Sequence, residues 1–152
     1  MSASYSKVLI ADDSSAVHQL ICSALSDDYS TSIVHAFDGL ECLNALDDGV
    51  DLAFIDVHMP TMGGMDAVWA ARIAGNKTFV TLISGQANRR CIDLARQLGA
   101  YEFLTKPFQC RRYRYNSGNA SARFDADASL AGGRLSGDAE SHAQGAQARF
   151  SI

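Results

Sequence analysis

Five residues that could carry out chemistry together follow short apolar runs at separate points of the chain. Asp12 and Asp13 follow the first run, Asp56 the third, Ser84 the fourth and Lys106 the fifth. If the runs are parallel strands of one sheet, the loops after their carboxyl ends meet at one edge, where open α/β sheets bind ligands. Each residue alone has an ordinary structural explanation, such as a helix cap or a solvated charge. All five at equivalent positions indicate a site.

The charge of this set predicts a metal ion. Two unit charges about 4 Å apart interact by roughly 4 kcal/mol at an effective dielectric near 20, so three clustered carboxylates would repel one another and take up protons. Lys106 offsets one charge, and a divalent cation would offset the rest. Oxygen ligands without His or Cys favour Mg²⁺ or Mn²⁺. Because Mg²⁺ keeps positions for water and phosphate oxygens, a phosphoryl group is the predicted substrate.

The elements that must position these residues alternate between strand-like and helix-like patterns. The strand-like apolar runs are 7–11, 31–36, 52–55, 78–83 and 101–105. Their alternation with helical stretches predicts an α/β fold, with a mostly parallel five-stranded sheet covered on both faces. The second and fifth runs are the most polar, which is typical of edge strands.

Apolar residues at helical spacing predict which helix faces are buried. Four faces are expected: Val17, Leu20, Ile21 and Leu25; Leu40, Leu43 and Leu46; Met65, Val68, Trp69 and Ile73; Cys91, Ala95 and Leu98. Ser14 or Ser15 is expected to cap the first helix, and Gly99 to end the last. The widely spaced Cys22, Cys42 and Cys91 are expected to be reduced apolar fillers.

Composition and charge exclude several classes of protein. Hydrophobic residues make up 47% of the chain, but no run approaches the 18 or more that a membrane helix needs. No signal peptide is recognisable, so a cytoplasmic protein is expected. Residues 1–108 carry 7 Lys and Arg against 13 Asp and Glu. This acidic part is unsuited to nucleic acid, which is bound largely through its phosphates.

Four short motifs resemble the response-regulator receiver family of two-component signalling. They are Asp12-Asp13, the run from Asp56 to Gly64 (DVHMPTMGG), Ser84-Gly-Gln and Lys106-Pro-Phe. The resemblance covers about residues 5–108, and the run after Asp56 is its most specific part. It implies a flavodoxin-like doubly wound fold with strand order 2-1-3-4-5, which periodicity alone cannot set.

The resemblance also implies how the metal site is divided among residues. Asp56 would be the phosphoacceptor, which attacks a phosphohistidine of a partner to form an acyl phosphate. Asp13 would bind Mg²⁺ directly and Asp12 largely through water. Asp56 would also be a metal ligand, as would His58 through its backbone carbonyl. The imidazole of His58 would face the mouth of the site and tune hydrolysis of the phosphate.

Further roles concern the response to phosphorylation. Ser84 would be the switch hydroxyl and Lys106 the phosphate-binding lysine. Phe103 matches an aromatic that rotates between exposed and buried positions, although a plain core aromatic would fit the same place. The peptide bond before Pro107 is expected to be cis, an isomer essentially confined to proline.

The function implied is a stand-alone signalling domain, similar to single-domain chemotaxis regulators, that assists only its own phosphorylation and dephosphorylation. Its partners would be a sensor histidine kinase or phosphotransfer protein and a downstream target protein that the sequence does not identify. A small aspartyl-phosphate phosphatase is the alternative, but that class has an acid two residues after its nucleophile, where this chain has His58. A flavodoxin-type cofactor binder would need a phosphate loop after the first strand, which is missing.

The composition changes after Gln109. Residues 109–152 are rich in Ala, Ser, Gly and Arg, with no aliphatic stripe for the final helix that Lys106-Pro-Phe opens in receivers. The presence of that helix is therefore in doubt, and disorder is the favoured prediction for this segment. A second hypothesis is a non-native, frameshifted tail, which sequencing of the coding region tests.

Overall fold

The five expected strands form one parallel sheet. The structure, a computed structural model, describes residues 7–25, 32–107, 110–116 and 121–126. The strands are β1 (Lys7–Ala11), β2 (Ser32–Ala36), β3 (Leu52–Asp56), β4 (Phe79–Ser84) and β5 (Glu102–Thr105). They lie in the order β2-β1-β3-β4-β5, all neighbours parallel. This confirms the doubly wound, flavodoxin-like fold.

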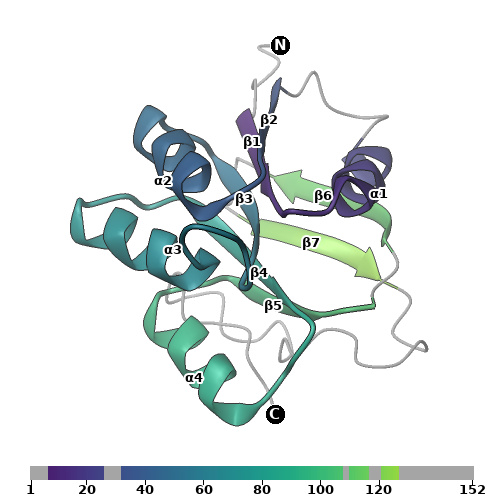
Figure 1. The fold of residues 1–152 in the computed structure, drawn as a ribbon. Helices are drawn as coiled ribbons and strands as arrows, with labels where there is room; N and C mark the ends of the chain where they lie inside the picture. The colour runs from purple at the N-terminus through teal and green to yellow at the C-terminus, as the bar shows by residue number, and fades with distance from the viewer. Residues whose placement is uncertain (1–6, 26–31, 108–109, 117–120, 127–152) are drawn as a thin grey trace.

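The connecting helices cover both faces of the sheet. They are α1 (Ser15–Leu25), α2 (Gly39–Asp48), α3 (Gly64–Ile73) and α4 (Arg89–Gln97). Figure 1 shows α2, α3 and α4 on one side of the sheet and α1 on the other. Strand residues alternate between the two layers: Leu9 of β1 packs in the core under α2–α4, and Ile10 packs in the core under α1. No helix in the described ranges is long and apolar enough to cross a membrane.

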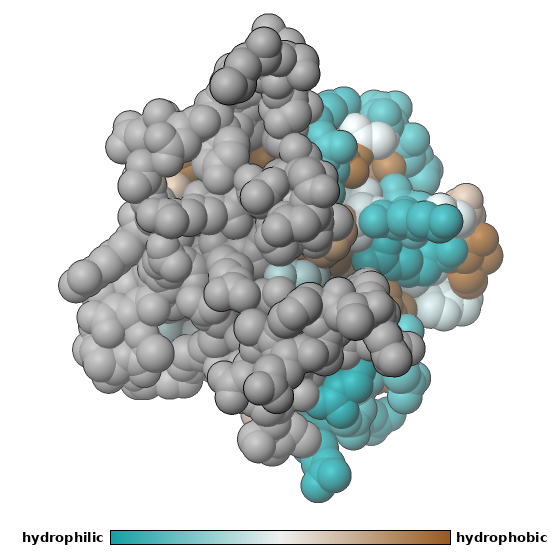
Figure 2. Space-filling model, turned by 180° about the vertical axis from the view of Figure 1, so that it is seen from behind, coloured by the Kyte–Doolittle hydropathy of each residue, from teal (hydrophilic) through white to brown (hydrophobic). Residues whose placement is uncertain are grey.

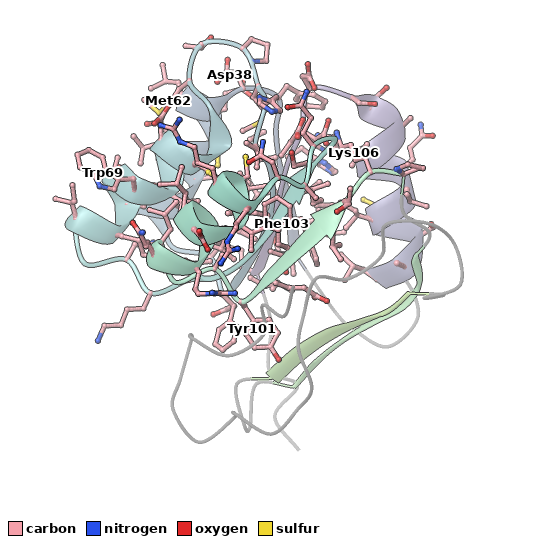
Figure 3. All side chains as sticks on the ribbon, turned by 90° about the horizontal axis from the view of Figure 1, so that it is seen from below. Asp38, Met62, Trp69, Tyr101, Phe103 and Lys106 are labelled. Carbon is pink, nitrogen blue, oxygen red and sulfur yellow. The ribbon has the colours of Figure 1, made fainter. Side chains whose placement is uncertain are left out.

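The predicted buried face of α3 is partly wrong. Trp69 and Ile73 are 59% and 66% exposed, whereas Ala67 and Ala71 are buried with Val68. The small side chains let α3 approach the sheet closely, and this turns the larger ones outward. Figure 3 shows Trp69 projecting away from the molecule, and hydrophobic surface is visible at the edge of the helical side in Figure 2.

The predicted faces of α1 and α2 are also partly wrong, whereas the face of α4 is confirmed: Ala95 is buried, and Cys91 and Leu98 pack against the core. In α1, His18 and Ala24 are buried with Ile21 and Leu25, and Leu20 is only half-buried. In α2, Leu40 is exposed. The predicted end of α4 is correct: Gly99 has a φ of 69°, and the backbone N–H of Ala100 donates to the Ala95 carbonyl, as in a Schellman motif.

Beyond β5, two further strands are present. β6 (Cys110–Asn116) and β7 (Ser121–Ala126) form an antiparallel pair, and β6 lies beside α1 (Figure 1). The pair lies within the segment for which the sequence favours disorder. Residues 117–120 and 127–152, like residues 5 and 6 at the start of the predicted domain, are outside the described residues. The predicted division into 5–108 and 109–152 therefore stays a prediction.

Candidate functional site

Three carboxylates meet at the carboxyl edge of the sheet. Asp12 and Asp13 follow β1, and Asp56 is the last residue of β3. Because β1 and β3 pair in parallel, their ends lie side by side, and one oxygen from each carboxylate lies within 4.8 Å of the others. Asp12 and Asp56 are buried, while Asp13 is exposed. The sheet thus brings Asp12 and Asp13 together with Asp56, which lies 43 residues after Asp13 in the chain.

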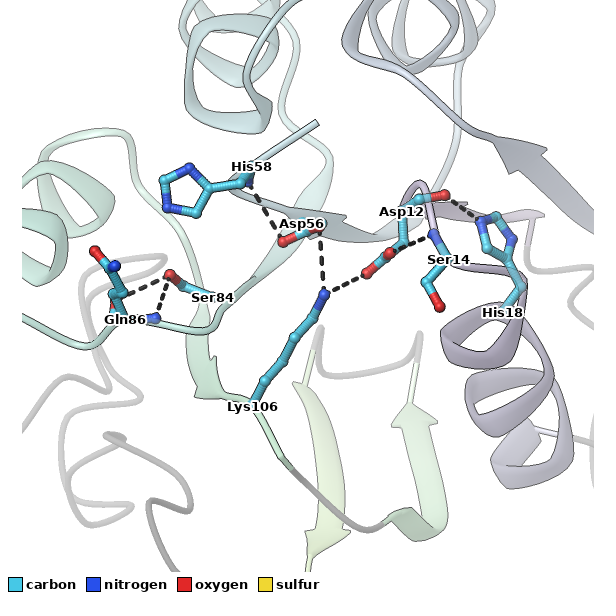
Figure 4. Close-up of polar contacts among 8 residues, drawn as sticks. All are labelled: Asp12, Ser14, His18, Asp56, His58, Ser84, Gln86 and Lys106. Atoms are coloured by element: carbon cyan, nitrogen blue, oxygen red, sulfur yellow. Dashed lines mark hydrogen bonds and ion pairs between the residues drawn. The ribbon is translucent and has the colours of Figure 1, made fainter. Parts of the chain in front are cut away.

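Lys106 is the counter-charge of this cluster. Its Nζ lies 3.0 Å from Oδ2 of Asp12 and 3.3 Å from Oδ2 of Asp56 (Figure 4). The lysine follows β5, two strands away from β3, so its long side chain reaches back across the edge of the sheet. The Lys106–Pro107 peptide bond is cis. One ammonium therefore contacts both buried acids.

Burial and neighbouring charges both shift the pKa values of the cluster. The pKa of Asp56 lies above its ordinary value because of burial and the negative charge of Asp12, and Lys106 only partly offsets these effects. For Lys106, burial lowers the pKa, but the hydrogen bond to Asp12 and the charges of both acids outweigh it and raise the pKa overall. Additional positive charge would thus be bound favourably here.

The donor set fits a hard divalent cation. The cluster offers carboxylate oxygens only, from two buried acids and one exposed acid. Three carboxylates face a single ammonium, that of Lys106, which contacts two of them. Mg²⁺ takes one or two protein carboxylates and keeps water or phosphate oxygens in its other positions. The exposed Asp13 leaves such positions accessible.

The loop after Asp56 depends on close backbone approaches. A side chain on Gly64 would collide with the Asp56 carbonyl oxygen, and one on Gly39 with that of Met62. The His58 backbone N–H donates to Oδ1 of Asp56 over 3.4 Å, a long hydrogen bond. Figure 4 shows the His58 imidazole on the side of Asp56 away from Asp12. This geometry explains why the run after Asp56 contains Gly64.

Thr61, in the same loop, has a left-handed backbone. Its φ is 71°, and the Met62 N–H donates to the Pro60 carbonyl over 2.7 Å. This three-residue turn with a positive φ is rare and strained for a β-branched residue.

Ser84 is the last residue of β4, the strand next to β3, and Phe103 lies on β5. The Ser84 hydroxyl donates to the Gln86 carbonyl over 2.9 Å and accepts from the Gln86 N–H over 3.0 Å, so it is held within its own loop (Figure 4). Phe103, on β5, is fully buried in the core on the α2–α4 side (Figure 3). The roles predicted for both stay predictions.

Two residues of this region were missed from the sequence. His18 lies 2.8 Å, through Nε2, from the Asp12 carbonyl oxygen, and Gln86 holds Ser84. The signal for His18 was available, because positions 18, 21 and 25 share one face of a helix and a polar residue on a buried face needs a partner. Nothing in the sequence pattern marks the backbone contact of Gln86.

Comparison with known proteins agrees with the geometry. The family model of the response regulator receiver domain matches residues 8–114. The transcriptional regulatory protein CpxR of Escherichia coli is 32% identical over 105 residues, which are 69% of this chain and 44% of that protein. The chemotaxis protein CheY of Treponema pallidum is 29% identical over 109 residues, 70% of this chain and 76% of that one. The chain thus spans less than half the length of CpxR.

Solved structures show the same fold. The chemotaxis response regulator CheY4 of Vibrio cholerae has a TM-score of 0.62 at 29% identity, over 70% of this chain and 90% of that one. The signal receiver domain of the putative response regulator NarL of Mycobacterium tuberculosis also has a TM-score of 0.62, at 31% identity, over 68% and 85%. With five strands in the order 2-1-3-4-5 and an acidic cluster at their carboxyl edge, this chain belongs to the family of response-regulator receiver domains.

Proposed function

We propose that this chain is a phosphoacceptor whose Asp56 is phosphorylated by a histidine kinase or phosphotransfer protein, with Mg²⁺ bound beside it. The observation that carries this is the contact of one ammonium, Lys106, with two buried acids that a third, exposed acid adjoins. Such an arrangement attracts a cation and leaves one open side for a phosphoryl donor.

The chemistry follows from the groups present. A carboxylate oxygen of Asp56 attacks phosphorus, a P–O bond forms, and the P–N bond of the phosphohistidine breaks as its electron pair returns to the imidazole, which takes up a proton. Lys106 is placed to stabilise negative charge on the phosphoryl oxygens. Asp12, Asp13 and the backbone carbonyl of His58 would hold Mg²⁺, which supplies charge neutralisation there.

Phosphorylation would change the second half of the site. A phosphoryl group adds nearly two negative charges and strong acceptors. The Ser84 hydroxyl would leave Gln86 to meet it, drawing the loop after β4 inward and opening space toward which Phe103 rotates. The resulting surface around α4 and β5 would be recognised by a downstream protein.

Labelling with acetyl phosphate tests this function. In Mg²⁺, we expect one base-labile phosphoryl group per chain, lost in Asp56→Asn and in EDTA. The Asp66→Asn variant, which alters an exposed acid of α3, is the matched control and should label normally. Undiminished labelling of Asp56→Asn contradicts the proposal, whereas sustained multiple-turnover release of phosphate would favour an aspartyl-phosphate phosphatase.

A further inference from the structure

A buried histidine supports the acidic loop from behind. His18, in the first turns of α1, is only 4% exposed. Its Nε2 lies 2.8 Å from the Asp12 carbonyl oxygen, and its Nδ1 lies 2.7 Å from Nδ1 of His35 on β2. The ring of Phe37 stacks on His18 with centroids 4.4 Å apart. Every polar atom of the His18 side chain is therefore used.

When His18 is neutral, the hydrogen bonds that link His35, His18 and Asp12 can run in only one direction. A carbonyl oxygen only accepts, so Nε2 of His18 carries the proton and donates to Asp12. A neutral imidazole then has a lone pair at Nδ1, which accepts from the Nδ1–H of His35. The exposed edge strand β2 is thereby connected through His18 to the backbone of the acidic loop.

The other polar atoms of Asp12 are also held. Its N–H donates to the Ala36 carbonyl at the end of β2 over 3.1 Å. Its Oδ1 accepts from the Ser14 N–H over 2.8 Å, and its Oδ2 from Lys106 over 3.0 Å. His18 provides the hydrogen bond to the remaining atom, the carbonyl oxygen (Figure 4).

The Asp12 carbonyl belongs to the peptide group that leads to Asp13. Among the described residues, no hydrogen bond or ion pair holds the exposed Asp13 carboxylate, so its direction depends on the orientation of that peptide plane. A hydrogen bond on the carbonyl fixes the plane, because the peptide group is rigid. Groups that orient metal ligands in this way typically affect metal affinity by tenfold or more.

We propose that His18, held by His35, is a positioning residue that orients the Asp12–Asp13 peptide and thereby sets the affinity of the acidic cluster for a divalent cation. The inference rests on the proposed metal site and deepens it. Cation binding is measured with Mn²⁺, whose free concentration is read by electron paramagnetic resonance, on the full chain and without a phosphoryl donor.

Two amide variants that differ by one methylene separate positioning from packing. In His18→Gln the amide reaches the place of Nε2 and can still donate to Asp12, whereas in His18→Asn it reaches only the place of Nδ1. We expect His18→Gln to bind Mn²⁺ within about threefold of the wild type and His18→Asn about tenfold more weakly. Urea unfolding in EDTA shows how far each change affects the fold without metal.

Variants of His35 and Phe37, the two neighbours of the His18 ring, complete the test. His35→Ala alters an exposed residue and should weaken Mn²⁺ binding about threefold, the effect of freeing one ring hydrogen bond. Phe37→Leu removes the stacked ring but no hydrogen bond, and should bind within twofold of the wild type. If the amide variants do not fold, His35→Ala decides: unchanged affinity overturns the inference.

The outcomes separate the inference from the proposed function. A wild type that binds Mn²⁺, with equal affinities in His18→Gln and His18→Asn, overturns the positioning role and leaves the metal site intact. A wild type that binds no Mn²⁺ overturns the metal site and the inference with it. Weaker Mn²⁺ binding in His18→Asn and His35→Ala but not in His18→Gln or Phe37→Leu, at similar metal-free stability, supports the positioning role and the metal site.

Discussion

The two sides of Asp56 are built differently. On one side, Asp12 is held through its N–H, its carbonyl and both carboxylate oxygens, and Lys106 connects it to Asp56. On the other, the Ser84 hydroxyl is hydrogen-bonded only to Gln86 of its own loop. One side is preorganised before any phosphoryl group arrives, whereas the other can rearrange at the expense of two local hydrogen bonds.

In the proposed function, this difference would separate binding of the phosphoryl group from the conformational switch that follows it. Preorganised charges stabilise a transition state without the cost of reorganisation, which suits the side that receives the phosphoryl group. The Ser84 hydroxyl has only two hydrogen bonds to give up, both within its own loop, which suits the switch role proposed for it. Substitutions on the two sides of Asp56 should therefore have different effects.

Removal of Lys106, the counter-charge shared by Asp12 and Asp56, should slow phosphorylation of Asp56 more than any other change. We expect Lys106→Met to lower the rate of Asp56 labelling by acetyl phosphate about 100-fold, the effect of deleting one preorganised charge donor. Rates at saturating Mg²⁺ measure this. Lys77→Met, at an exposed lysine of the opposite edge of the sheet, is the control, and equal rates in the two variants would remove Lys106 from the mechanism.

Neutralisation of Asp56 should stabilise the protein without metal. Its raised pKa means that the folded state binds the proton more tightly than the unfolded chain, whose ordinary value is 3.8. The stability of the wild type therefore falls as the pH rises through the folded-state pKa and stays low above it. We expect Asp56→Asn to have a higher free energy of unfolding than the wild type in EDTA at pH 7, because the amide carries no charge to bury.

The same gain should shrink as the pH is lowered and vanish well below 3.8, where the wild-type carboxyl is protonated in both the folded and the unfolded state. Urea unfolding at a series of pH values measures it. A gain that does not vary with pH would show that Asp56 titrates normally. The charge of Asp56 would then be balanced already by Lys106.

Release of backbone strain next to the site should give a smaller gain. Thr61 has a φ of 71°, a conformation that costs a non-glycine residue about 1 kcal/mol or more, of which glycine's extra chain entropy offsets part. We expect Thr61→Gly to raise the free energy of unfolding by roughly 0.5–1 kcal/mol. Thr61→Ala keeps the strain and should show no gain; an equal gain in both would assign the effect to the side chain.

Loss of the Ser84 hydroxyl should leave cation binding almost unaltered. Ser84→Ala removes the two hydrogen bonds with Gln86 but touches none of the acids, so we expect Mn²⁺ affinity within twofold of the wild type. Titration beside the wild type checks this. A loss as large as that of His18→Asn would mean that the two sides are one cooperative unit.

How much of the site was predictable differs from residue to residue. Asp12, Asp13, Asp56 and Lys106 were found because each follows a strand-like run, and parallel strands bring such positions together. Gln86 was not, because it acts through backbone atoms that every residue possesses. The burial of His18 was predictable from its place on the helix face that also carries Ile21 and Leu25, but its partner, a backbone carbonyl, leaves no mark in the sequence.

The sequence by itself determined the alternation of strands and helices, the positions of the acids at strand ends, and the motif after Asp56, since these depend on residue type and local spacing. Tertiary structure decided which face of each helix is buried. Trp69 and Ile73 looked like core residues and are exposed, because Ala67 and Ala71 allow α3 to lie closer to the sheet. Only packing across elements determines such distances, and it also placed His18 against Asp12.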